Sequence, residues 1–151
     1  MRLFNEKSNQ QIYPQVALQL KEKDFYYFLN PDACEDLLCL WLYAQYGYIC
    51  IPSTKKKSTE LYECVLVDPK TGKKIYAQVK KGNIDLATSD FIKLDGDVWL
   101  FTTEGKIIGN DKPNIFKANP EEIYKFALSQ EAKNILPKSI TRWIEYLSKK
   151  G

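Results

Sequence analysis

The segment 61–81, LYECVLVDPKTGKKIYAQVKK, constrains the fold of this chain more than any other stretch. Two strand-like runs flank the turn 68–72, DPKTG, in which a proline and a glycine reverse the chain. A hairpin with a two- or four-residue loop pairs residues whose numbers sum to 141, so Glu63 lies across from Gln78. Alternate residues of a strand share a face, which places Lys80 beside Gln78. The segment predicts a carboxylate, an amide and a lysine on one patch of sheet, an arrangement suited to metal-assisted attack on a phosphodiester.

The two faces of this hairpin differ in chemistry. One is a conventional core face, made of Tyr62, Cys64, Leu66, Ile75, Ala77 and Val79. The other is apolar near the turn and polar at the far end, and carries Glu63, Val65, Val67, Lys74, Tyr76, Gln78 and Lys80. This second face needs a cover, and we expect the apolar helix 33–46 to provide it. The first turn of that helix holds Glu35 and Asp36, so a second carboxylate can reach the polar patch.

The rest of the chain alternates between helical and strand-like patterns. Asn30 and Pro31 are typical of a helix start and Gly47 of a helix end, which bounds the apolar helix. The other expected elements are a helix at 15–28, strands at 48–51 and 98–102, a short helix or loop within 84–94, and helices at 121–130 and 139–149. This order predicts a single α/β domain over 1–151, with a mixed β-sheet of about four strands flanked by helices.

Composition excludes several classes of mechanism. Histidine is absent, so no reaction here can use an imidazole base or ligand. The four cysteines have no CxxC spacing and lie in apolar patterns, so we interpret them as buried free thiols rather than a zinc site: Cys34, Cys39, Cys50 and Cys64. No apolar run approaches the ~20 residues of a membrane span, and the N-terminal residues lack a signal-peptide core. We therefore expect a cytoplasmic protein, with no membrane partner, whose catalysis uses carboxylates, lysine, hydroxyls and a bound metal.

Positive charge gathers around the hairpin, although the net charge is only +3. Lys55, Lys56 and Lys57 precede the hairpin, and Lys81 ends it. Such runs are most often solvated surface, and contact with phosphates is the functional alternative. With two arginines in the chain, bidentate recognition of guanine is nearly unavailable. We expect any nucleic-acid contact to be with phosphates and to carry little base specificity.

The order of these elements resembles the PD-(D/E)xK restriction-endonuclease-like superfamily. The matching features are a helix with Glu35, a strand, a strand with Glu63, a strand with the tripeptide 78–80, then a helical link and a strand. The tripeptide, Gln-Val-Lys, is similar to the QxK variant of the Mrr-like branch. This α-β-β-β-(α)-β resemblance covers about residues 30–102, and the C-terminal helices at about 119–149 lie outside it.

The resemblance implies a role for each matching residue. Glu63, the amide oxygen of Gln78 and the carbonyl of Val79 would hold Mg²⁺ or Mn²⁺. Lys80 would orient or activate the attacking water and stabilise the developing phosphorane charge. Glu35 would hold the metal through water or orient Lys80. The implied function is a metal-dependent nuclease that hydrolyses phosphodiester bonds, with DNA as the expected substrate and defence or repair as the biological role.

Two departures from the family pattern keep a second function open. Glu63 stands where aspartate is usual, and Gln78 replaces an acidic ligand, which leaves fewer carboxylates for a hard cation. The alternative is a catalytically weakened nuclease-like fold that serves as a nucleic-acid-binding or protein-interaction module. The three hairpin residues would then be plain cross-strand polar neighbours, and Glu35 would serve the helix dipole. The choice between DNA and RNA, and between a monomer and a homodimer, stays open.

Overall fold

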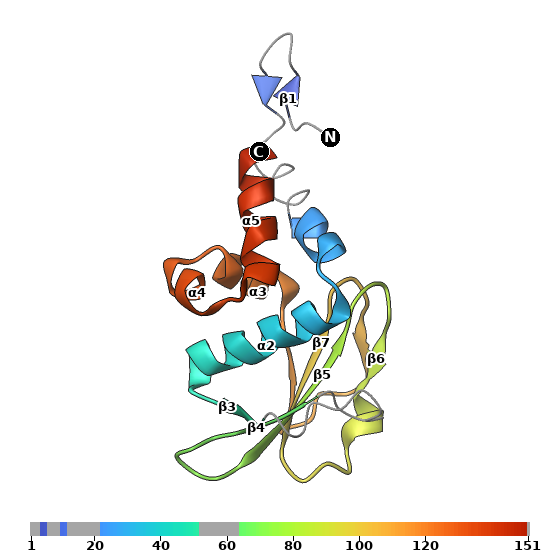
Figure 1. The fold of residues 1–151 in the computed structure, drawn as a ribbon. Coiled ribbons are helices and arrows are strands. Elements are labelled where there is room, and N and C mark those ends of the chain that lie inside the picture. The colour runs from blue at the N-terminus through green and yellow to red at the C-terminus, as the bar shows by residue number, and fades with distance from the viewer. Residues whose placement is uncertain (1–3, 6–9, 12–21, 52–63, 151) are drawn as a thin grey trace.

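A five-stranded mixed sheet forms the centre of the structure, a computed structural model that describes residues 4–5, 10–11, 22–51 and 64–150 (Figure 1). The strands lie in the order β3-β4-β5-β7-β9. Their bounds are Ile49–Ile51 for β3, Cys64–Val67 for β4, Lys74–Lys80 for β5, Asp97–Thr102 for β7 and Ile115–Lys117 for β9. The first three are antiparallel, whereas β7 and β9 join in parallel. The single-domain α/β class with a mixed sheet is thus confirmed, and β9 extends the sheet beyond the strands that we predicted.

The β4–β5 hairpin has the predicted register where the structure describes it. Cys64 pairs with Ala77, and in each of the following pairs the two residue numbers also add up to the predicted 141. The hairpin is closed by a hydrogen bond from the Asp68 N–H to the Lys73 carbonyl, at 2.9 Å. Inside the turn, the Gly72 N–H donates to the Asp68 carbonyl, and Gly72 has φ 75°, a left-handed conformation that glycine adopts without strain. The turn chemistry of 68–72 therefore sets which side chains share a face.

The helices and short strands have these bounds. A helix covers 22–28, followed by α2 at Pro31–Tyr46, α3 at Pro120–Ala127, α4 at Gln130–Ile135 and α5 at Lys138–Lys150. A 3-10 turn, η2, spans Thr88–Phe91. Two small pairs complete the strands: β1 at Phe4–Asn5 with β2 at Gln10–Gln11, and β6 at Leu86–Ala87 with β8 at Ile107–Ile108. Among the helices of these described segments, none is both long and apolar enough to cross a membrane.

Helix α2 begins and ends at the residues expected from its caps. The side chain of Asn30 accepts a hydrogen bond from the Ala33 N–H at 2.7 Å, and Pro31 occupies the first turn. At the other end, Gly47 has φ 76°, and its N–H donates to the Tyr43 carbonyl at 2.8 Å. Local chemistry alone therefore fixes both ends of the helix that lies across the sheet.

One predicted helix differs from the structure, and another is described only in part. The helix expected at 15–28 is described only from residue 22 onward. The helix expected at 121–130 ends at Ala127, because Ser129 begins a new helix, α4, by accepting the Ala132 N–H on its hydroxyl at 3.2 Å. The final helix agrees with the prediction to within a residue at each end.

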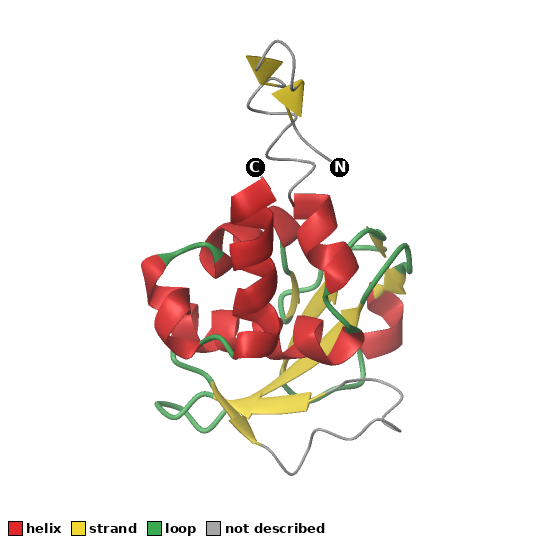
Figure 2. Cartoon of the chain, turned by 45° about the horizontal axis from the view of Figure 1, so that its top comes forward, coloured by secondary structure: helices red, strands yellow, loops and turns green. Residues whose placement is uncertain are grey.

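The sheet separates two hydrophobic cores of unequal size. Most helices gather on one side of the sheet, and α2 lies directly on it (Figures 1 and 2). Side chains of α2, α3 and α5 pack there with one face of the sheet, made of Cys64, Leu66, Ile75, Ala77, Val79, Trp99 and Phe101. The smaller core on the other side contains Val65, Tyr76, Val98 and Leu100, and is covered by Leu86 and Phe91 from the β6–η2 segment.

This arrangement corrects one expectation. We predicted that the helix 33–46 covers the second face of the hairpin, but α2 covers the first, wholly apolar face. The physical reason is that α2 buries mostly apolar side chains, and these lose more water-exposed area against Ile75 and Ala77 than against a face that ends in Gln78 and Lys80. The second face is buried instead by the chain that links β5 to β7.

Candidate functional site

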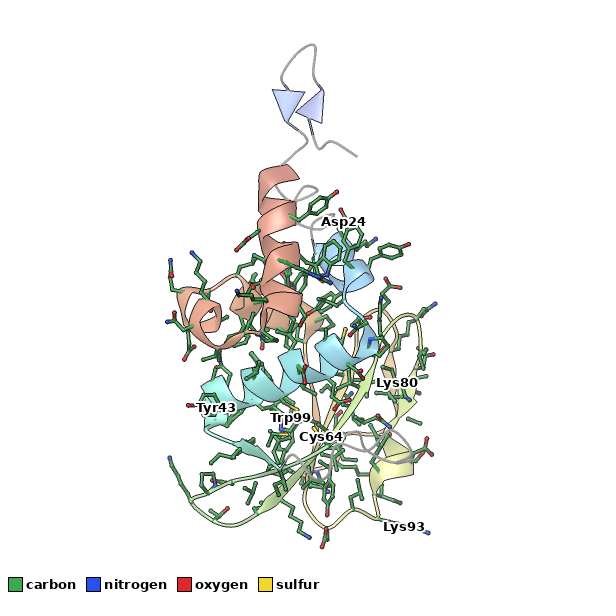
Figure 3. The ribbon with its side chains drawn as sticks, in the orientation of Figure 1. Asp24, Tyr43, Cys64, Lys80, Lys93 and Trp99 are labelled. Carbon is green, nitrogen blue, oxygen red and sulfur yellow. The ribbon has the colours of Figure 1, made fainter. Side chains whose placement is uncertain are left out.

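The tripeptide 78–80 forms the last three residues of β5, a central strand of the sheet. Gln78 is only 3% exposed and pairs with Leu100 of β7. Lys80 is half-buried and pairs with Thr102 (Figure 3). Since alternate residues share a face, both side chains leave β5 on the side opposite α2. The structure thus places an amide and a lysine together, as the sequence predicted.

Backbone geometry shows which edge of β5 carries oxygen atoms. The Lys80 carbonyl accepts a hydrogen bond from the Thr103 N–H at 3.1 Å, so it faces β7. Successive backbone groups of a strand point to alternate sides, so the N–H and carbonyl of Val79 face the β4 side. The Val79 N–H donates to Oε1 of Gln78 at 3.1 Å. The amide oxygen of Gln78 and the carbonyl oxygen of Val79 therefore lie at the same edge of β5.

The loops beyond this end of β5 are cross-linked by hydrogen bonds. The hydroxyl of Thr102 donates to the Ile84 carbonyl at 2.7 Å and accepts from the Gly105 N–H at 3.1 Å. Thr102 is the parallel partner of Lys80, so the loop after β5 is tied to the end of β7 at the level of this lysine. These hydrogen bonds hold the backbone at Lys80 in place, and so help to position its side chain.

Glu35 lies in α2 and is 9% exposed, which is low for a carboxylate. It approaches the sheet from the helix-covered face, where it influences Cys64. A hydrogen bond with Cys39 lowers the pKa of Cys64, but hydrogen bonding with Cys50, burial and the charge of Glu35 together raise it well above its usual range. The role of Glu35 at the tripeptide stays a prediction.

The remaining predicted site residues divide into two groups. Glu63 and the loop lysines Lys55, Lys56 and Lys57 lie outside the described residues, so their roles stay predictions. Lys81 is described: its ammonium group donates to the Tyr27 carbonyl at 2.7 Å and lies 5.7 Å from the centre of the Tyr27 ring. Lys81 therefore joins the end of β5 to the helix at 22–28, and its contact with nucleic acid also stays a prediction.

Three cysteines meet between α2 and the sheet, which sequence spacing did not indicate. Cys39 comes from α2, Cys50 from β3 and Cys64 from β4, and their sulfur atoms all lie within 4.8 Å of one another. The sulfurs of Cys39 and Cys64 are 3.0 Å apart, and no disulfide joins any of the described cysteines. The only sequence signal for this group was that all three residues lie in apolar patterns, which predicts burial. The three sulfurs meet only because α2 packs on the sheet.

Comparison with known proteins identified no relative of this chain. No protein-family model, no curated protein and no solved structure matches the chain. Its chemistry is therefore inferred from its own residues: the oxygens and the lysine at the end of β5, and the three thiols beneath α2.

Proposed function

We propose that the chain is a metal-dependent nuclease whose site is the β4-side edge of β5 at its C-terminal end. The observation that carries the proposal is that Gln78 Oε1 and the Val79 carbonyl face the same edge of β5, and that Lys80 is the next residue of the strand. The element order from α2 through β7 agrees with the α-β-β-β-(α)-β order of the family which the sequence resembles. This order supports the proposal at the level of topology.

The donor set fits a hard divalent cation. Amide, carbonyl and carboxylate oxygens are the ligands that Mg²⁺ and Mn²⁺ accept, and Glu63, one residue before β4, supplies the negative charge in this proposal. A bound Mg²⁺ or Mn²⁺ would polarise the phosphodiester and activate water. The chain's own part is to hold Gln78 and Val79 in a fixed strand and to keep the Lys80 ammonium beside the nucleophile and the developing phosphorane charge.

The substrate in this proposal is nucleic acid, with DNA favoured. Lysines supply the phosphate contacts, from the loop at 55–57 and from Lys81, and the scarcity of arginine favours weak base specificity. A cytoplasmic enzyme of defence or repair is the biological role that we propose for it.

A specific observation also favours a second candidate, a catalytically weakened nuclease-like fold that binds nucleic acid or protein. Oε1 of Gln78 already accepts the Val79 N–H, and its amide carries no charge to attract a cation. A site with this ligand would bind Mg²⁺ less tightly than one with a carboxylate. In this case the lysines would bind phosphates without hydrolysis.

The distinguishing experiment measures cleavage and metal binding together. The full chain is incubated with supercoiled plasmid, single-stranded DNA and RNA at millimolar Mg²⁺ or Mn²⁺, and metal binding is followed by calorimetry. We expect Lys80→Ala to lower the cleavage rate by about 10²-fold, as removal of a charge-stabilising group does in other enzymes.

Lys74→Ala is the matched control. Lys74 is exposed on the same strand and the same face, roughly 20 Å away along the backbone, so its loss should leave the rate unchanged. Nucleic-acid binding without cleavage or metal uptake would support the second candidate. Metal-dependent cleavage that survives both Lys80→Ala and Glu63→Ala would show that the chemistry lies elsewhere in the chain.

A further inference from the structure

The group formed by Cys39, Cys50 and Cys64 lies apart from the proposed nuclease site. All three side chains lie on the helix-covered face of the sheet, whereas Gln78 and Lys80 leave β5 on the opposite face. Cys50 pairs with Leu66 across the β3–β4 ladder, so it is the diagonal neighbour of Cys64. Cys39 of α2 packs on these two residues and brings the third sulfur. Three elements thus each contribute one sulfur to a single cluster. Figure 3 shows one member, Cys64, beneath α2.

We propose that these three cysteines form a binding site for one thiophilic metal ion, with Cu(I) as the preferred ion. A metal about 2.3 Å from each of three sulfurs in a plane holds the sulfurs about 4 Å apart. The observed spacing, from 3.0 Å for Cys39 and Cys64 to at most 4.8 Å within the group, brackets that value. Small side-chain rotations would therefore complete the coordination without movement of the backbone.

The donor set selects the ion. Each thiol gives up its proton to the solvent when the metal binds, and the resulting thiolate sulfur is a soft ligand that favours Cu(I) and Zn(II) over Mg²⁺ or Ca²⁺. Structural zinc sites are almost always four-coordinate, yet the chain has no histidine, and within the described residues the group consists of three cysteines with no carboxylate. Three sulfurs without a fourth protein ligand suit Cu(I), which is stable in a three-coordinate site.

Access and selectivity also follow from the surroundings. Cys64 is fully buried and Cys39 is 8% exposed, while Cys50 on the outer strand β3 is half-buried and offers the approach from solvent. Buried thiols that merely pack would need no common meeting point. Cys34 is such a case, since it is fully buried in the same helix as Cys39 and stands outside the group.

The test uses the reduced full chain under anaerobic conditions, with Cu(I) delivered from a competing chelator. Thiolate-to-copper charge-transfer absorption reports binding at the sulfurs. We expect one equivalent of Cu(I) per chain for the wild type and for Cys34→Ala. Cys50→Ala should weaken the affinity by more than about 100-fold, because loss of an outer-shell partner alone costs 10–100-fold.

Cys50→Ala is the decisive variant because its side chain is the least buried of the three, so the fold is the least disturbed. Far-UV circular dichroism and thermal melts of the metal-free proteins check this. A second readout is alkylation followed by mass spectrometry, in which one equivalent of Cu(I) should protect Cys39, Cys50 and Cys64. Equal affinity of the wild type and Cys50→Ala, or displacement of Cu(I) by stoichiometric Zn(II), would overturn the proposal.

Discussion

Tyr76 belongs to the smaller core, and its hydroxyl donates a hydrogen bond to a carboxylate oxygen of the exposed residue Asp95 at 2.5 Å. This hydrogen bond is the main cause that lowers the pKa of Asp95, and the charge of Lys74 also contributes. Because the carboxyl has a lower pKa in the folded protein than in the unfolded chain, its contribution to stability is present above 3.8 and is lost as the pH falls below that value.

Tyr76→Phe should therefore destabilise the protein more at neutral pH than in acid. The measurement is urea unfolding of the wild type and the variant at neutral pH and at a pH below the lowered pKa of Asp95. We expect the difference in unfolding free energy to shrink on acidification, because a protonated carboxyl accepts a weaker hydrogen bond. Asp95→Asn should remove the same acid dependence, and a difference that stays constant with pH would refute this assignment.

Gly105 is required by a close approach of two loops. A methyl group at this position would overlap the carbonyl oxygen of Ile84 and lie 2.7 Å from the hydroxyl oxygen of Thr102. We expect Gly105→Ala to cost about 1–3 kcal/mol of unfolding free energy, the usual penalty of overpacking. Glu104→Ala, an exposed neighbour, should change it by less than about 0.5 kcal/mol in the same denaturant titration. Equal stabilities of the two variants would contradict the close approach.

At the scale of elements, the N-terminal cap positions α2 and with it both Glu35 and Cys39. Asn30→Ala removes the acceptor of the Ala33 N–H and should lower the unfolding free energy by about 1 kcal/mol. Asn30→Asp keeps an acceptor and adds a favourable charge at the helix start, so it should match the wild type. Thermal and chemical unfolding of both variants provide the measurement. A loss of the same size in Asn30→Asp would mean that the cap contributes through something other than this hydrogen bond.

Elements specified by local chemistry were predictable from the sequence, and those specified by distant pairing were not. The turn at 68–72 and the caps of α2 are encoded by a few neighbouring residues, and both are confirmed. Strand β9 is only three residues long and exists through its parallel pairing with β7, for which no local pattern is diagnostic. The face that α2 covers likewise depends on the packing of the whole molecule, and there the prediction was wrong.

At the scale of the whole molecule, the sheet separates the two groups of residues for which we propose a function. The amide oxygen of Gln78 and the carbonyl of Val79 lie with Lys80 at the end of β5, and the sulfurs of the three cysteines lie beneath α2 on the opposite face. The first group could be predicted because its members are consecutive in one strand. The second could not, because Cys39, Cys50 and Cys64 come from three elements that meet only in the folded chain.

The most direct test of the proposed nuclease site is the anomalous scattering of Mn²⁺ in crystals of the full chain. The proposal predicts one Mn²⁺ peak at the β4-side edge of β5, within coordination distance of Gln78 Oε1 and the Val79 carbonyl and beside Lys80. A Mn²⁺ peak elsewhere, or none, in protein that cleaves DNA with Mn²⁺ would contradict it.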